Sequence, residues 1–167
     1  MAIADALLPE FDHEIAITRT LLERVPDDKA AWKPHSRSMS MGELAIHVAN
    51  LTRWTRFTLV GTEFDTSPVG GEPFVSKGWS SKADTLAALD AGAAEARTAI
   101  AATSDADMMV PWSLKAGGQT IFSMPRASVL RSFVLSHIIH HRGQLSVYLR
   151  LNDVAVPPIY GPSADER

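Results

Sequence analysis

The chain has 167 residues, of which 46% are hydrophobic and 21% are charged. These values are near globular averages, so we expect one folded domain over residues 1–167. The formal net charge is −3 and the basic residues are scattered, which argues against a nucleic-acid partner. No apolar run approaches the roughly 18 residues of a membrane span, and the N-terminus does not have the basic start of a signal peptide. We therefore expect a cytoplasmic protein with no membrane partner.

The chain contains no cysteine. It therefore forms no disulfide, provides no thiolate ligand for a metal and has no cysteine nucleophile. If thiol chemistry takes place at this protein, the thiol must arrive with a substrate.

The first half of the chain predicts two helices followed by a long loop. Apolar residues at intervals of three and four predict an amphipathic helix over residues 4–25. Ser40, followed three residues later by Glu43, forms the pattern of a capping box and predicts a second helix that runs to about Val60. Residues 65–80 are interrupted by several prolines and glycines, so we predict a loop there.

A third helix is predicted over residues 81–102, because Ser81 and Asp84 are suited to a helix N-terminus. Short runs at residues 108–112 and 119–123 flank a Gly-Gly pair. This arrangement predicts a small hairpin between the third and fourth helices.

The fourth helix is predicted to begin near Pro125 and to run to about Leu151. The tail, residues 154–167, is rich in proline and glycine, and we expect it to lie along the surface or to be partly disordered. Four helical patterns with little strand signal predict an all-α fold, a four-helix bundle.

Histidines lie on the inward faces of two of the predicted helices. At about 100° per residue, His137 and His141 lie about 40° apart in the middle of the apolar stripe of the fourth helix. His140 falls at the edge of this stripe, so we interpret it as an outer partner. His47 shares the inward face of the second helix with apolar residues. We therefore expect three imidazoles, those of His47, His137 and His141, to point into the bundle.

Three buried imidazoles without partners would cost about 1–3 kcal/mol for each unsatisfied group, and a metal ion removes that cost. Imidazole is a common ligand of zinc, nickel, copper and iron, and an i, i+4 pair supplies two ligands from one helix. Three protein ligands leave a position for water or substrate, as in catalytic sites. Spacing alone leaves two alternatives open, a hydrogen-bonded core role for His47 and a metal-free histidine network.

Glu10 and His13 have the spacing found in carboxylate-bridged di-iron bundles. Such a bundle needs a second motif of this kind and further glutamates, and the chain has no second one. We therefore interpret the pair as solvated helix surface.

Two segments of the chain resemble the DinB/YfiT-like metalloenzymes. They are residues 40–47, S-M-G-E-L-A-I-H, and residues 136–145, S-H-I-I-H-H-R-G-Q-L, and residues 158–162, P-I-Y-G-P, are also similar. The resemblance implies a four-helix bundle, often in a homodimer. It also implies one divalent metal ion, zinc or nickel, held by residues His47, His137 and His141.

Some members of this family join small thiols such as bacillithiol or mycothiol to electrophiles, while many have no assigned reaction. The resemblance therefore implies a metal-dependent thiol S-transferase in detoxification or stress, with a small thiol and an electrophilic small molecule as partners. The alternative is a non-catalytic metal-binding or interaction protein.

Arg142 lies off the apolar stripe and is predicted at the surface or a dimer interface. Gln144 could orient a ligand or make a structural hydrogen bond, and the loop at residues 65–80 could cover the pocket.

Overall fold

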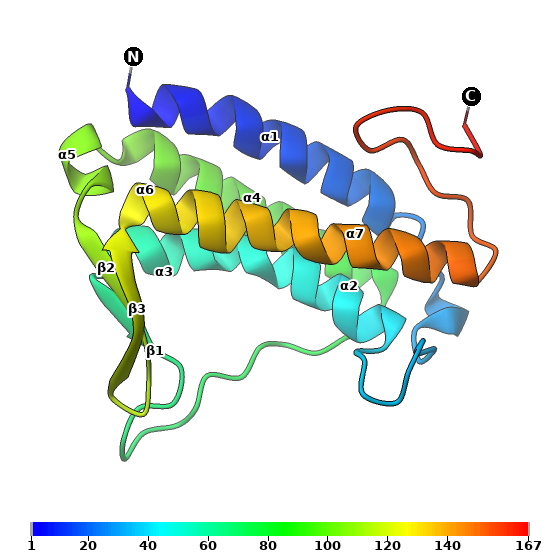
Figure 1. Ribbon diagram of the computed structural model, residues 1–167, viewed down its shortest axis with the longest axis horizontal. Helices are drawn as coiled ribbons and strands as arrows, with labels where there is room; N and C mark the ends of the chain where they lie inside the picture. Colours follow the sequence, from blue (N-terminus) through cyan, green and yellow to red (C-terminus); the bar gives the residue numbers. More distant parts are fainter. Residues whose placement is uncertain (1, 167) are drawn as a thin grey trace.

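Residues 2–166 are described by a computed structural model in which four helical rods lie along one another and a small sheet lies at one end (Figure 1). α1 contacts α4 and α7, and α2 also contacts α4 and α7, which closes the bundle. Among the helices of residues 2–166, we find none whose length and apolar character would let it traverse a bilayer. The rods are α1 (Ile3–Leu22), α2–η2–α3 (Met41–Asn50, Leu51–Arg53, Trp54–Val60), α4 (Lys82–Ala102) and α6–η3–α7 (Arg126–Ser128, Val129–Leu135, Ser136–Leu151), with short η1 (Asp27–Lys29) and α5 (Asp105–Met108) between them.

Side-chain caps begin two of these helices where the sequence predicts. The Ser40 hydroxyl accepts from the Glu43 amide at 3.2 Å, and the Ser40 amide donates to the Glu43 carboxylate at 2.7 Å, which completes the capping box of α2. The Ser81 hydroxyl accepts from the Asp84 amide at 3.0 Å at the start of α4. Both predicted helix starts are confirmed.

The fourth rod is not a uniform α-helix, because η3 is π-helical. The Ser136 hydroxyl donates to the Arg131 carbonyl, five residues earlier, at 3.0 Å, which reaches across this wider turn. A wheel of about 100° per residue does not describe such a segment. π-Helical turns occur often at functional sites, and this one ends directly before α7, which carries His137 and His141.

The predicted helix-rich fold is confirmed, but it is not strictly all-α, because a three-stranded mixed sheet is present in the order β1-β2-β3. The predicted hairpin is confirmed as the antiparallel pair β2 (Pro111–Ala116) and β3 (Gln119–Pro125). Its turn is Gly117-Gly118, with φ of 59° and 76°, the left-handed conformation that glycine adopts without strain.

β1 (Glu63–Asp65) was not predicted, and it pairs in parallel with β2. It is only three residues long, too short to show a period in the sequence. The carboxylate of Asp65 accepts from the amides of Gly117 and Gly118 at 3.1 and 2.7 Å. This strand is therefore held by a turn that lies far along the chain.

The predicted long loop between the second and third helices is present after β1, and it is anchored to α2 rather than free. The buried Asn50 side chain donates to the Ser76 hydroxyl at 3.0 Å and to the Lys77 carbonyl at 3.1 Å. Trp79 packs so closely on Gly42 that an added Cβ would lie 2.7 Å from the indole. The loop therefore passes over the helix that carries His47.

The C-terminal tail lies along the surface, as predicted, and ion pairs hold it there. Asp165 pairs with Arg150 at the end of α7 and accepts from the Val156 amide at 2.9 Å. Glu166 pairs with Arg24 at 2.5 Å. These contacts bring the tail back along α1 and α7 (Figure 1).

Candidate metal site

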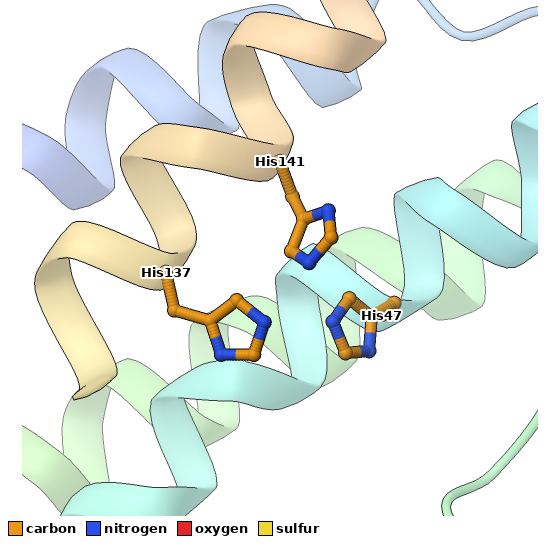
Figure 2. Close-up of side chains that lie close together, drawn as sticks. All are labelled: His47, His137 and His141. Carbon is orange, nitrogen blue, oxygen red and sulfur yellow. The ribbon is translucent and has the colours of Figure 1, made fainter.

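Three histidines from two rods meet inside the bundle. Figure 2 shows His47 on α2 facing His137 and His141 on α7, with one nitrogen of each ring directed toward the others. The ring centroids are 5.2 Å apart for His47 and His137, 4.6 Å for His47 and His141, and 4.7 Å for His137 and His141. One nitrogen from each ring lies within 4.8 Å of the others, so the group could hold a metal ion.

Each ring is placed by the local structure of its helix. His137 and His141 are one turn apart on α7, so their side chains project from the same face. His47 lies on α2, which packs directly against α7. All three side chains are half-buried, between the core and solvent.

Burial keeps these imidazoles neutral. The pKa of His137 is lowered to about 4, first by burial and then by the charges of His141, His47 and His140. Burial, followed by the charge of His141, also lowers the pKa of His47. The pKa of His141 is lowered by burial, although its hydrogen bond to Gln144 opposes this. Neutral rings at pH 7 have a lone pair to offer, which is what metal binding requires.

The hydrogen-bond partners of the rings fit a metal ligand set. Within residues 2–166, Nε2 of His47 is buried and has no hydrogen-bond partner. Nδ1 of His141 lies 2.7 Å from Oε1 of Gln144, and an amide oxygen only accepts, so Nδ1 donates and Nε2 keeps its lone pair. A buried ring nitrogen without a hydrogen-bond partner is costly, and a cation bound between the rings would remove that cost.

Aromatic side chains line one side of the histidine group. The ring of Phe133 lies 5.6 Å from the ring of His137, and Trp54 packs edge-on against Phe133 at 5.3 Å. Phe74, from the long loop, contacts Trp54 at 5.8 Å. These rings form an apolar boundary on that side of the group.

An open groove of about 280 Å³ lies on another side, next to His47. The loop forms one wall of this groove and α2 with the residues before it forms the other. The lining residues are Met39, Glu43, Ile46, His47, Ser76, Lys77 and Gly78. A small molecule could therefore approach His47 from solvent.

The structure brings together the three histidines that the sequence singled out, and it leaves the others apart. His140 is exposed and lies outside the group, where its Nε2 is 3.2 Å from Nε2 of Gln144. His13 is exposed on α1. Glu10, the other half of the di-iron-like pattern, pairs with Arg131 at 3.2 Å.

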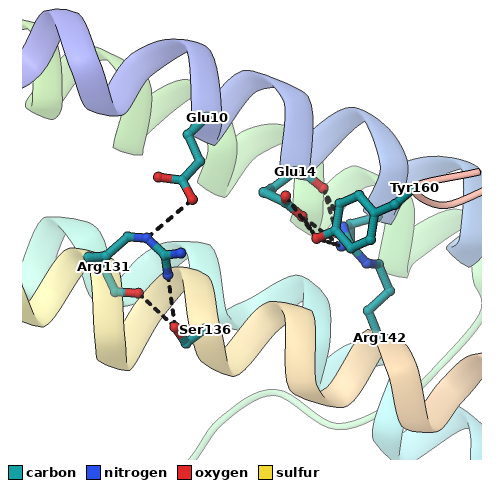
Figure 3. A network of polar contacts seen from close by, with 7 residues as sticks. Glu10, Glu14, Arg131, Ser136, Arg142 and Tyr160 are labelled. Atoms are coloured by element: carbon teal, nitrogen blue, oxygen red, sulfur yellow. Dashed lines mark hydrogen bonds and ion pairs between the residues drawn. The ribbon is translucent and has the colours of Figure 1, made fainter.

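The prediction that Arg142 lies at the surface or a dimer interface is wrong. Its guanidinium is buried and contacts Glu14 on α1, as Figure 3 shows. Nη1 donates to the Glu14 carbonyl at 3.1 Å and to the Thr18 hydroxyl at 3.3 Å. The Tyr160 hydroxyl, from the tail, accepts from Nη2 at 2.5 Å and lies 2.9 Å from both Glu14 carboxylate oxygens.

The apolar stripe does not predict the burial of Arg142, because α7 buries two faces and not one. The histidine stripe faces α2, whereas a second stripe faces the rest of the core and α1. The buried residues of that stripe recur at intervals of three and four, namely Ile138, Arg142, Leu145 and Leu149. This spacing could have placed Arg142 inside, and Glu14 could have been recognised as its partner only from the packing of α1 on α7.

The sequence of the chain matches those of known proteins. A sequence model of the DinB superfamily matches residues 10–145. The chain is also 25% identical over 166 residues to the uncharacterized protein YrdA of Bacillus subtilis strain 168, an alignment that covers 97% of this chain and 90% of that protein.

Two crystal structures have a similar fold. A DinB-like protein from Bacillus cereus ATCC 10987 superimposes with a TM-score of 0.71 at 19% identity, over 93% of this chain and 97% of that one. A DinB-like protein of Bacillus subtilis, YjoA, gives 0.67 at 19% identity, over 95% and 99%. The sequence match and the shared helix-rich fold lead to one conclusion: the chain belongs to the DinB superfamily.

Proposed function

We propose that this protein binds one divalent metal ion, zinc or nickel, through His47, His137 and His141, and that it is a metal-dependent thiol S-transferase acting in detoxification or stress. The single observation that carries the metal site is the convergence of three neutral imidazoles, one of which has a buried Nε2 without a partner. The S-transferase reaction rests on the family resemblance together with this donor set.

The chain's own residues would supply three nitrogen ligands, one fewer than the four that zinc usually takes in proteins. Imidazole nitrogens suit both zinc and nickel. The ion, when bound, would act as a Lewis acid that lowers the pKa of a coordinated thiol. The chain has no cysteine, so the sulfur must belong to a substrate.

The proposed reaction joins the substrate thiol to an electrophilic carbon. The S–H bond breaks and its proton passes to water, the sulfur lone pair forms the new S–C bond, and the leaving group departs with its electron pair. The groove beside His47 provides a route for the substrates, and the aromatic residues Phe133 and Trp54 shield the other side of the ligand set. His137 and His141 are held on one face of α7, so little ordering is needed when a ligand binds.

Elemental analysis of protein purified without an affinity tag tests the metal site. We expect about one equivalent of zinc or nickel in the wild type and its loss in His47→Ala and His141→Ala. His13→Ala is the matched control, because His13 is exposed on α1 and should keep the metal. Wild-type protein that binds no metal after reconstitution would exclude the site.

Turnover of a panel of small thiols with alkylating electrophiles tests the reaction. We expect conjugation by the metal-loaded wild type and by His13→Ala, and background rates for His141→Ala. If the loaded wild type conjugates none of these thiols faster than buffer, the transferase assignment is wrong even though the metal site stands.

A non-catalytic metal protein is the second candidate, and one observation favours it. The three ligands come from α2 and α7, so a bound ion would join two rods and stabilise the bundle. Melting with and without a chelator measures this effect. A large loss of stability with the chelator, together with no turnover, would support this candidate over the transferase.

Homodimer formation, a cytoplasmic location and the absence of a nucleic-acid partner stay predictions. Sedimentation of the purified protein at several concentrations checks the oligomeric state. A single species at the monomer mass of 18.1 kDa would contradict the homodimer.

A further inference from the structure

We infer that Gln144 and His140 are positioning residues that hold His141 in the tautomer able to bind a metal. This inference rests on the proposed metal site, and it assigns a role to two polar residues outside the ligand set. Both lie on α7 within one turn of His141.

A chain of two hydrogen bonds links the three side chains. Oε1 of Gln144 lies 2.7 Å from Nδ1 of His141, and Nε2 of Gln144 lies 3.2 Å from Nε2 of His140. The rings of His140 and His141 are 4.8 Å apart, so one amide spans the gap between them.

The orientation of the amide decides which nitrogen of His141 carries hydrogen. An amide presents an acceptor at its oxygen and donors at its nitrogen, and a neutral imidazole has one donor and one acceptor nitrogen. With the oxygen of Gln144 toward His141, Nδ1 must donate and Nε2 has the free lone pair. With the amide reversed, Nδ1 would have to accept, and the hydrogen would sit on Nε2, which could then not bind a metal.

In the orientation of the amide in the structure, Nε2 of His140 accepts from the amide nitrogen, and neutral His140 then carries its hydrogen on Nδ1. Without this acceptor, the NH₂ group of Gln144 would have only water as a partner. The free-energy difference between the two orientations of the amide would then be smaller. Hydrogen bonds of this kind to the second nitrogen of a ligand histidine fix its tautomer and its ring orientation. Here two side chains act in series: His140 orients the amide of Gln144, and Gln144 sets the tautomer of His141.

Substitution at position 144 tests the first link. Gln144→Leu removes the acceptor, and we expect its affinity for Zn²⁺ to fall by about tenfold, the lower end of the usual range, because Gln144 is exposed and water competes. Gln144→Glu keeps an acceptor and cannot be reversed, so its Zn²⁺ affinity should equal or exceed that of the wild type. Affinities are measured by competition with a chromophoric chelator.

His140→Leu tests the second link in both backgrounds. We expect it to weaken Zn²⁺ binding several-fold when residue 144 is Gln, and to have no effect in the Gln144→Glu background, because a carboxylate has no donor end to orient. Equal losses in both backgrounds would show that His140 acts without Gln144 and would overturn this link. Unfolding midpoints of the metal-free variants confirm that each one folds.

Nitrogen-15 chemical shifts of the histidine side chains separate this inference from the metal site itself. In the metal-free wild type we expect His141 with hydrogen on Nδ1, and in Gln144→Leu a mixture of tautomers. A wild type that binds no Zn²⁺ yet shows this difference would exclude the metal site but would leave the role of Gln144 in setting the tautomer intact. Unchanged tautomers, with Gln144→Leu binding Zn²⁺ as tightly as the wild type, would overturn the role of Gln144.

Discussion

Nη2 of Arg142 lies 2.6 Å from Oε2 of Glu14 inside the bundle, where the two side chains are 1% and 6% exposed. The pair joins α7 to α1, whereas the neighbouring His141 faces α2. Consecutive residues of α7 thus contact two different rods.

Removing one partner of this ion pair should destabilise the protein strongly. We expect Arg142→Met to lower the free energy of unfolding by about 3–5 kcal/mol, because the Glu14 carboxylate would stay buried without its partner. Urea denaturation measures the loss. Arg97→Met is the control, since Arg97 pairs with Asp12 at the surface and should cost less than about 1 kcal/mol. Similar losses in both variants would contradict a special role for the buried pair.

The hydroxyl of Tyr160 should contribute to stability through the same network. Tyr160→Phe removes hydrogen bonds to the charged groups of Arg142 and Glu14, and we expect a loss of roughly 1–2 kcal/mol. Tyr148→Phe is the matched control, because its hydroxyl makes one longer contact, at 3.3 Å, with the Met39 carbonyl. Urea midpoints that shift equally in the two variants would argue against the network.

The metal-free protein should lose stability as the pH falls below about 6.5. The pKa of His137 is lowered to about 4 in the folded protein, so the unfolded chain binds a proton between these pH values that the folded chain does not. The stability that neutral His137 contributes should be fully present above 6.5, the ordinary pKa of the unfolded chain. It should be fully lost once the pH is below about 4, the pKa of His137 in the folded protein. The lowered pKa values of His47 and His141 act in the same direction.

Urea midpoints measured from about pH 7 to pH 4.5 check this slope. His137→Leu should flatten it, because the group that stays unprotonated in the fold is gone. His13→Leu, which changes an exposed histidine of α1, should leave it unchanged. A wild-type midpoint that rises as the pH falls would show that the histidines are not buried in their neutral form.

Two glycines in helices should respond oppositely to alanine. A Cβ at Gly92 of α4 would lie 2.2 Å from the hydroxyl oxygen of the buried Thr52, so Gly92→Ala should cost about 1–3 kcal/mol. A Cβ at Gly143 of α7 would meet no atom within 4 Å among residues 2–166 beyond its chain neighbours and the adjacent backbone of its own helix, so Gly143→Ala should stabilise the protein by about 0.5–1 kcal/mol. Thermal melting of the two variants checks both signs.

Much of the fold could be predicted because its signals are local. The capping box at Ser40 and the cap at Ser81 involve residues three apart, and the Gly117-Gly118 turn lies between two adjacent strands. The spacing of His137 and His141 is likewise settled within one turn of α7. Interactions between residues so close in the chain can be recognised from the sequence alone.

The missed features depend on contacts between distant segments. β1 is a strand only because Glu63 and its neighbours pair with β2, and the π-helical η3 interrupts a rod whose pattern predicts an ordinary helix. Arg142 is buried only because α1 supplies Glu14 opposite it. The hydrophobic periodicity of one segment does not identify a partner on a distant segment.

The sequence by itself determined the rods, their caps and the chemistry of the donor set, with imidazoles present and thiolates absent. Only the tertiary structure decided that His47 meets His137 and His141, and that Nε2 of His47 is buried without a hydrogen-bond partner. Helix formation follows from interactions a few residues apart, whereas the meeting of α2 and α7, and the loss of water between them, follows from burial of both helices against the same core.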